Sequence, residues 1–383
     1  MEIYKIPIEF AIITFPFIAF ILTIPFLIYQ YRKYGAIPIL KSIIFYSFIL
    51  YLITAYFMVI LPLPSMEYVK NLKTAYIQLQ PFQFIQDIIV TMPKTISSFN
   101  DVLKLFNLST IYVVIFNFLL TLPFGVYLKY YFNKKWYQTI IYTFLLSLFF
   151  ELTQLSGLYG FYPRPYRLFD VDDLIINTLG GFAGHILTPI FMLFLPTQKE
   201  LENKSYKKGQ KVSLVRRGVA VLIDAVFIAM LNLLILMFTF NTKALYYSHL
   251  IAILSYYIFI PLVGNGRTIG KKILQIQVMD QNNQVKIYKS ISRYLIAALF
   301  IIYPNTIPSI LETMKVMPII TICTKILISL FILVNILFYV FAKQKNDKVF
   351  LYEKITTTKN ISTIEYKEEI VEEKIQNIKK KEK

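Results

Sequence analysis

The chain has 383 residues, of which 56% are hydrophobic and 16% aromatic, while only 16% are charged. Its mean hydropathy of +0.57 excludes an ordinary soluble domain, and its single cysteine, Cys323, excludes an intramolecular disulfide. The formal net charge is +18, but Lys and Arg lie in short segments beside apolar runs, where they set topology and contact anionic membrane lipids. The composition therefore predicts an all-α, polytopic transmembrane helical bundle that does not bind nucleic acid.

Apolar runs near the length of about 20 residues that crosses a bilayer recur along the whole chain. The predicted spans are 9–30, 39–61, 108–128, 137–155, 172–195, 214–240, 246–263, 293–309 and 317–341. Pro304 and Pro308 break the run at 293–309, so the sequence predicts an interrupted helix there.

Basic residues between the spans predict the orientation. They cluster around 32–41, at 129–135, in the linker 196–213 and in the segment 265–293. By the positive-inside rule these segments face the cytoplasm of a bacterial-type plasma membrane. The N-terminus is then outside and the C-terminus inside, with the loops 62–107 and 156–170 on the outer face.

The linker KELENKSYKKGQK is the sharpest change in composition, so we place a boundary between two modules near residue 210. Residues 1–210 are predicted to hold about five transmembrane helices. Residues 211–355 are predicted to hold three to four, and 356–383 to form a charged cytoplasmic tail.

The first module carries ionisable residues at the ends of two successive spans, where they are costly in lipid. Glu151 and Gln154 follow Ser147 at spacings that place all three on one helix face. The next helix repeats such a stripe with Asp173 and Asn177. Because a short outer loop joins the two helices, their ends must be neighbours.

The same loop and helix supply the other members of the predicted outer site. These are Arg167, as the counter-charge, and Asp170; Gly180 and Gly184 form a G-x-x-x-G step for close helix packing. A structural reading also applies, because Asp170 and Asp173 suit the cap and first turn of a helix, and glycines more often pack than bind.

These residues resemble the signature of the VanZ-like family, over about residues 35–195. The segments E-L-T-Q and R-L-F-D-V-D-D-L-I-I-N-T-L-G-G-F-A-G carry the pattern positions, which are Glu151, Gln154, Arg167, Asp170, Asp173, Asn177, Gly180 and Gly184. The family is named for teicoplanin resistance, so the resemblance implies a context in the cell envelope rather than a reaction.

The second module carries Asp224 about two turns inside a helix that Arg217 opens, on the same face. After the next helix, alternating residues from Ile276 and an Asn282-Asn283 turn predict a small cytoplasmic β-hairpin with the segment 285–287.

This module resembles the RDD family through R-x-x-A-x-x-I-D at 217–224 and G-R-T-I-G-K at 266–271. The resemblance implies a second aspartate, for which Asp347 is the first candidate and Asp280 the other. It also implies transport of a ligand that it does not identify.

Three functions are compatible with these patterns. We expect no cofactor and no metal site, and only the third function has a form that uses a metal ion. The first is a non-enzymatic envelope protein whose outer site binds or shields a cell-wall precursor, a lipid headgroup or a glycopeptide. The second is a transporter or ion exchanger that uses Asp224 with Glu151. The third is a membrane enzyme for a lipid-linked substrate, with Glu151 and Asp173 as acid and base or as ligands of a divalent cation.

Overall fold

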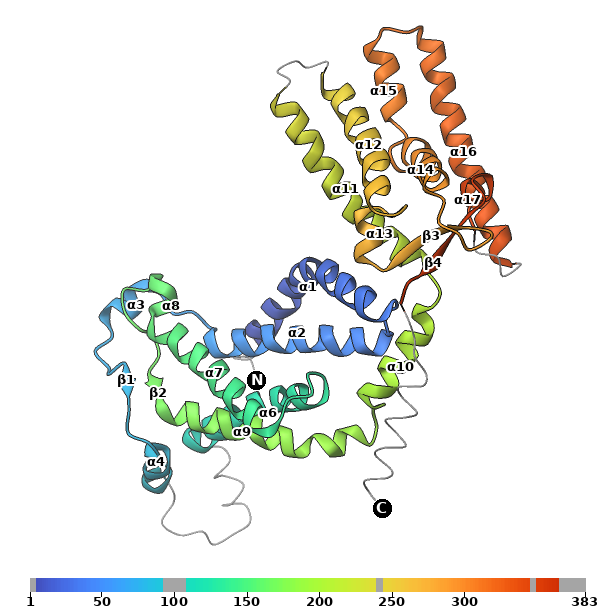
Figure 1. Ribbon diagram of the computed structural model, residues 1–383. Coiled ribbons are helices and arrows are strands. Elements are labelled where there is room, and N and C mark those ends of the chain that lie inside the picture. The colour runs from blue at the N-terminus through green and yellow to red at the C-terminus, as the bar shows by residue number, and fades with distance from the viewer. Residues whose placement is uncertain (1–4, 92–107, 239–243, 345–348, 365–383) are drawn as a thin grey trace, which may run out of the picture. The chain divides into compact units, whose positions relative to one another are not determined.

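The structure is a computed structural model, and it describes residues 5–91, 108–238, 244–344 and 349–364 (Figure 1). The chain forms two compact units. The first contains residues up to 22 together with 38–201, and the second contains 23–37 together with the residues from 202 onward. The long first helix, α1 (Lys5–Tyr34), therefore contributes its start to one unit and its end to the other.

The first unit is built from long apolar helices joined by short elements (Figure 1). Its long helices besides the start of α1 are α2 (Ile39–Ile60), α6 (Ser109–Tyr130), α7 (Trp136–Leu155) and α9 (Val171–Met192). Its short elements are α3 (Met66–Asn71), β1 (Ile77–Gln78), α4 (Gln83–Thr91), α8 (Gly157–Gly160) and β2 (Phe169–Asp170). The parallel pair β1–β2 joins the segment after α2 to the residues just before α9.

The second unit is also helical, with one small sheet, and is entered through α10 (Gln198–Gly209). Its helices are α11 (Leu214–Met237), α12 (Ala244–Val263), α13 (Ile269–Ile273), α14 (Ile287–Ala297), the π-helix η2 (Ala298–Ile302), α15 (Thr306–Thr313), α16 (Pro318–Gln344) and α17 (Leu351–Ile355). Its strands are β3 (Ile276–Asp280) and β4 (Thr358–Ser362).

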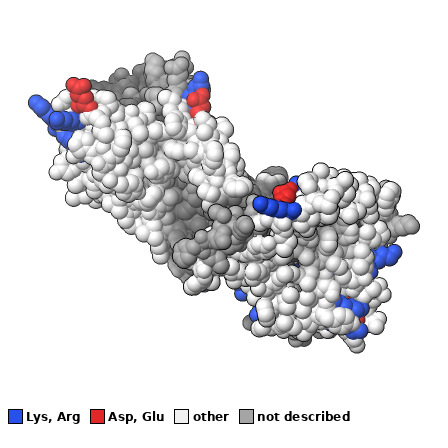
Figure 2. Space-filling view, turned by 90° about the horizontal axis from the view of Figure 1, so that it is seen from above, with Lys and Arg blue, Asp and Glu red and all other residues white. Residues whose placement is uncertain are grey.

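Seven helices in the described ranges are long and apolar enough to cross a membrane: α1, α2, α6, α7, α9, α11 and α16. The helices from Ile287 to Ile302 and from Thr306 to Thr313 would make an eighth span, but they meet at an angle of 72°, near the prolines that interrupt this run. Large apolar side chains remain exposed along these helices, as Phe20 does at 77%, and Figure 2 shows a mostly uncharged face. The prediction of an all-α polytopic bundle is confirmed.

Glycines bring α6 and α9 into backbone contact. A Cβ atom added at Gly184 would overlap the carbonyl oxygen of Leu122, and one at Gly180 would overlap that of Phe118. The reverse holds for Gly125 of α6, whose Cβ would meet the carbonyl oxygen of Gly181. Only a residue without a side chain lets two helices approach so closely in lipid.

In the small sheet of the second unit, strand β3 pairs with a different segment from the one predicted. β3 pairs antiparallel with β4, in a register that places Ile276 opposite Ser362, and not with the segment 285–287. The turn at Asn282-Asn283 does form, but α14 begins at Ile287. Because β4 reads TKNIS, it lacks the apolar alternation that would have marked it as a strand.

Candidate functional site

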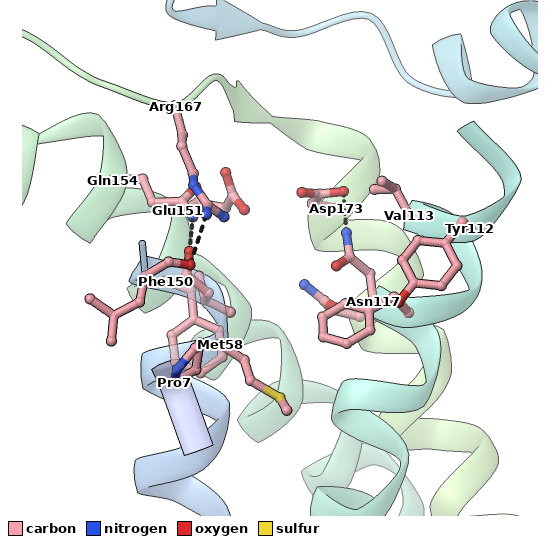
Figure 3. A pocket seen from close by; sticks show the side chains of 14 residues that line it. Pro7, Met58, Tyr112, Val113, Asn117, Phe150, Glu151, Gln154, Arg167 and Asp173 are labelled. Carbon is pink, nitrogen blue, oxygen red and sulfur yellow. Dashed lines mark hydrogen bonds between the residues drawn. The ribbon is translucent and has the colours of Figure 1, made fainter. Parts of the chain in front are cut away.

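A pocket of about 220 Å³, here called the polar pocket, lies in the first unit where α7 ends and α9 begins. Five of the predicted outer-site residues line it: Glu151, Gln154, Arg167, Asp173 and Asn177. Figure 3 shows the first three on one side and Asp173, with Asn117 of α6, on the other. The remaining predicted member, Asp170, lies just outside the lining.

Glu151 is held by the start of α9. It is only 3% exposed, and its Oε2 accepts a hydrogen bond of 3.0 Å from the backbone N–H of Asp170. Asp170 is itself the N-cap of α9, since its Oδ1 accepts from the N–H of Asp172 at 2.8 Å. Burial raises the pKa of Asp170. Asp170 therefore caps α9 and orients Glu151, and its Oδ1 also accepts a hydrogen bond of 3.2 Å from Gln78 Nε2.

The opposite wall is built by α6 and α9. Asn117 donates to Asp173 Oδ1 at 2.6 Å, and the Asn177 amide donates to Ser147 at 2.8 Å. The buried Oδ1 of Asn177 has no hydrogen-bond partner among the described residues. A buried acceptor without a partner is uncommon in a folded protein, and here it belongs to a residue that lines the pocket.

Sequence reasoning missed Asn117 because it lies 56 residues before Asp173. Thr121 lies one turn further along α6 and donates to the backbone oxygen of Asn177 at 2.6 Å. The spacing of Asn117, Thr121 and Gly125 in an otherwise apolar helix is the signal that could have found this face.

Arg167 lies beside the carboxylates without forming an ion pair with any described Asp or Glu. It donates to the backbone oxygen of Leu61 at 3.1 Å, and Gln154 donates to that of Val59 at 3.0 Å. Both bonds attach the end of α2 to the polar pocket (Figure 3). The two carboxylates that line the pocket thus keep capacity to accept further hydrogen bonds.

Asp172 was not singled out in the sequence, yet it is buried at 2% exposure. Its two oxygens accept from the backbone N–H groups of Phe82 at 2.6 Å and Phe84 at 2.9 Å, where α4 begins. It fastens the segment after α2 to the first turn of α9.

Arg217 and Asp224, singled out in the second module, both lie in the second unit but do not pair with each other. Arg217 forms an ion pair of 3.1 Å with Glu353 of α17. Asp224 Oδ1 accepts from the hydroxyl of Tyr256 at 2.6 Å and from the N–H of Gly270 at 2.7 Å, which ties α11 to α12 and α13. Asp347 lies outside the described residues.

Asp280, the other candidate for the second aspartate, closes the turn after β3. It accepts from the N–H groups of Asn282 at 2.9 Å and Gln284 at 3.0 Å and pairs with Lys286 at 3.2 Å. The backbone hydrogen bond with Gln284 leads the contacts that lower its pKa.

Two buried residues of this unit escaped sequence reasoning. Arg216, at 0% exposure, donates to the backbone oxygens of Gly35, Gly209, Leu274 and Gln275. Glu353, also at 0%, accepts from both Arg217 and Arg293. Their partners are distant in sequence, so no local pattern marks them.

The residues present limit the chemistry of both units. No group of three or more His, Cys, Asp or Glu that could hold a metal ion occurs within the described ranges. The polar pocket offers two carboxylates and an amide oxygen as acceptors, with Arg167 and Gln154 as donors bonded to the backbone.

The fold and the buried polar residues at its helix ends define a multi-pass, helical integral membrane protein. The VanZ/LLP1 family model matches residues 48–195, and the RDD family model matches residues 211–350. The chain is therefore a fusion of an N-terminal VanZ-like part and a C-terminal RDD part, and these families point to a membrane protein of the cell envelope. No similar curated protein and no similar solved structure was found.

Proposed function

We propose that the polar pocket binds a hydrogen-bond-donating headgroup of a cell-envelope molecule, such as a cell-wall precursor or a lipid. The observation that carries this proposal is the surplus of buried acceptors. Glu151 and Asp173 line the pocket without a cation paired to either, and Asn177 Oδ1 has no partner in the described part of the chain. Ammonium, amide and hydroxyl groups are the donors that satisfy such acceptors.

The volume of the polar pocket limits the size of the group that it can bind. At about 220 Å³ it is smaller than pockets for drug-sized molecules, which occupy roughly 300–1,000 Å³. This supports one sugar ring, an amino acid or a lipid headgroup as the bound part, with the rest of the molecule outside. A whole glycopeptide antibiotic would then contact the site through one group only. On the predicted topology, the pocket faces the outer surface, where these molecules are found.

The test is ligand binding by the full-length protein in lipid nanodiscs. The probes are a lipid-linked cell-wall precursor, aminoacylated and glycosylated lipids, and teicoplanin. We expect Glu151→Gln and Asp173→Asn each to weaken binding by about tenfold or more, because each replaces one carboxyl oxygen, which can accept a hydrogen bond from the ligand, by an amide N–H donor.

Glu67→Gln is the matched control, since Glu67 is an exposed residue of α3 that does not line the pocket. It makes the same chemical change and should leave affinity unaltered. Equal affinity of the Glu151→Gln protein and the control, for every probe that binds, would refute the proposal.

A further inference from the structure

A cavity of about 310 Å³ lies within the second unit and has two chemically different parts; it is here called the amphipathic cavity. One part is apolar and is lined by residues of α11, η2 and α16, among them Val221, Ile301 and Ile336. The other part is basic and is lined by Arg217, Lys271 and Arg293.

The basic part has more positive charge than its acidic partners balance. Glu353 accepts hydrogen bonds from both Arg217 and Arg293. Asp224 is occupied by Tyr256 and Gly270. With three cations facing two carboxylates, one positive charge is in excess when all are ionised.

Lys271 carries that excess. It is 9% exposed and forms no ion pair with a described carboxylate; its Nζ donates to Asn360 Oδ1 at 3.2 Å and lies 5.4 Å from the centre of the Tyr294 ring. The Nε atom of Arg217 is also buried without a partner among the described residues. A buried cation without a counter-ion is costly, and a bound anion would remove that cost.

We propose that the amphipathic cavity binds a single-chain anionic amphiphile. Its phosphate or carboxylate contacts Lys271 and Arg217, and the adjoining part of its acyl or isoprenyl chain lies along Val221, Ile301 and Ile336. Apolar walls alone would accept any lipid chain, and basic residues alone would accept any anion. Their combination in one cavity selects a molecule that has both parts.

The experiment measures binding to the full-length protein in an uncharged detergent. The probes are oleoyl lysophosphatidate, oleate, oleoyl lysophosphatidylcholine and inorganic phosphate. We expect the two single-chain anions to bind, the zwitterion to bind at least about tenfold more weakly, and inorganic phosphate to be unable to displace either. Equal binding of the zwitterion, or displacement by phosphate alone, would overturn the proposal.

Two adjacent lysines provide a matched pair of variants. Lys271→Met should weaken binding of the anions about tenfold, whereas Lys272→Met, which removes the same charge from an exposed position, should not. Equal losses would mean that the probes respond to the general charge of the protein, and no loss with Lys271→Met would exclude the assigned headgroup contact.

Gly218 gives a second variant that leaves every charge in place. It lines the amphipathic cavity, and a Cβ added there would meet no atom within 4 Å. Gly218→Phe should fill the apolar part and abolish binding of both anions without lowering the melting temperature. Unchanged binding would contradict the placement of the chain. Because neither this site nor its probes involve the polar pocket, the result is independent of the function proposed above.

Discussion

At the scale of single residues, the charge state of Lys271 is set by its surroundings. Burial lowers its pKa to about 7, with Arg293 and Arg217 acting in the same direction. The charged and titratable groups around it are Arg217 and Asp224 on α11, Tyr256 on α12, Arg293 and Tyr294 on α14 and Glu353 on α17. The carboxylates oppose the fall in pKa without cancelling it.

The binding of an anion in the amphipathic cavity should therefore depend on pH. Between about pH 6 and pH 8 Lys271 loses most of its charge, while the phosphate of oleoyl lysophosphatidate gains its second charge. The variant Lys271→Met keeps the phosphate effect and lacks the lysine. We therefore expect the affinity of the unaltered protein divided by that of Lys271→Met to fall by up to about tenfold over this range. Titrations of both proteins at several pH values measure this ratio, and a ratio that does not change with pH would show that the lysine does not contact the headgroup.

The lowered pKa of Lys271 also predicts how the stability of the ligand-free protein changes with pH. The pKa of Lys271 in the folded protein lies below that of an exposed lysine, so between about pH 7 and 10 the unfolded chain binds more protons. This residue therefore makes the folded state more stable as the pH rises through that window.

Single residues also show what the sequence could and could not predict about the sites. The spacing of Glu151, Gln154, Asp173 and Asn177 was sufficient to place them on facing helix ends, because helix periodicity and a short loop restrict the geometry. The spacing of Asn117, Thr121 and Gly125 marks a polar and small face of α6, but no local rule states which other helix packs against that face.

At the scale of elements, α6 and α9 depend on glycine for their contact. Gly184→Ala would place a methyl group against the carbonyl oxygen of Leu122. We expect this to lower the free energy of unfolding by about 1–3 kcal/mol, the usual cost of overpacking. Thermal unfolding of the purified protein in detergent measures the change.

Gly218→Ala is the control for that experiment, because its methyl group would enter open space in the interior of α11. It should be neutral or raise stability by up to about 1 kcal/mol, since alanine favours helix more than glycine does. If Gly184→Ala were equally harmless, α6 and α9 could not be in backbone contact.

The attachment of α4 offers another prediction at this scale. Asp172→Ala removes both acceptors of the Phe82 and Phe84 N–H groups. We expect faster hydrogen–deuterium exchange at these amides with little change in α7 and α9, because the bonds hold only the start of α4. Asp87→Asn, on the exposed side of α4, should leave the exchange rates at Phe82 and Phe84 unchanged.

Elements were predicted with uneven success for a physical reason. Long apolar helices such as α11 can be predicted from the sequence, because a run of roughly 20 apolar residues has the length and composition of a membrane-spanning helix. The pairing of β3 with β4 was missed because the two strands are separated by α14, α15, α16 and α17, and the polar sequence of β4 resembles a loop.

At the scale of the whole molecule, the orientation in the membrane is a prediction from loop charges. With Cys323 replaced by alanine, Phe161→Cys should react with an impermeant maleimide in intact cells, and Lys204→Cys should react only after lysis. Both positions are exposed, so a difference in labelling reports the side of the membrane. Reversed labelling would place the polar pocket on the cytoplasmic side.

The contribution of α1 to both units affects how the protein must be made. Arg216 donates to the backbone oxygen of Gly35, a residue of the second unit that is synthesised 181 positions earlier. At about 5–20 residues per second, the ribosome needs roughly 10–35 s to supply this partner. During that interval the end of α1 has been synthesised, while residues 202 onward, which make up the rest of its unit, are still incomplete. A ribosome stalled between residues 37 and 201 would therefore leave the end of α1 without the hydrogen bond from Arg216 and without the rest of its unit.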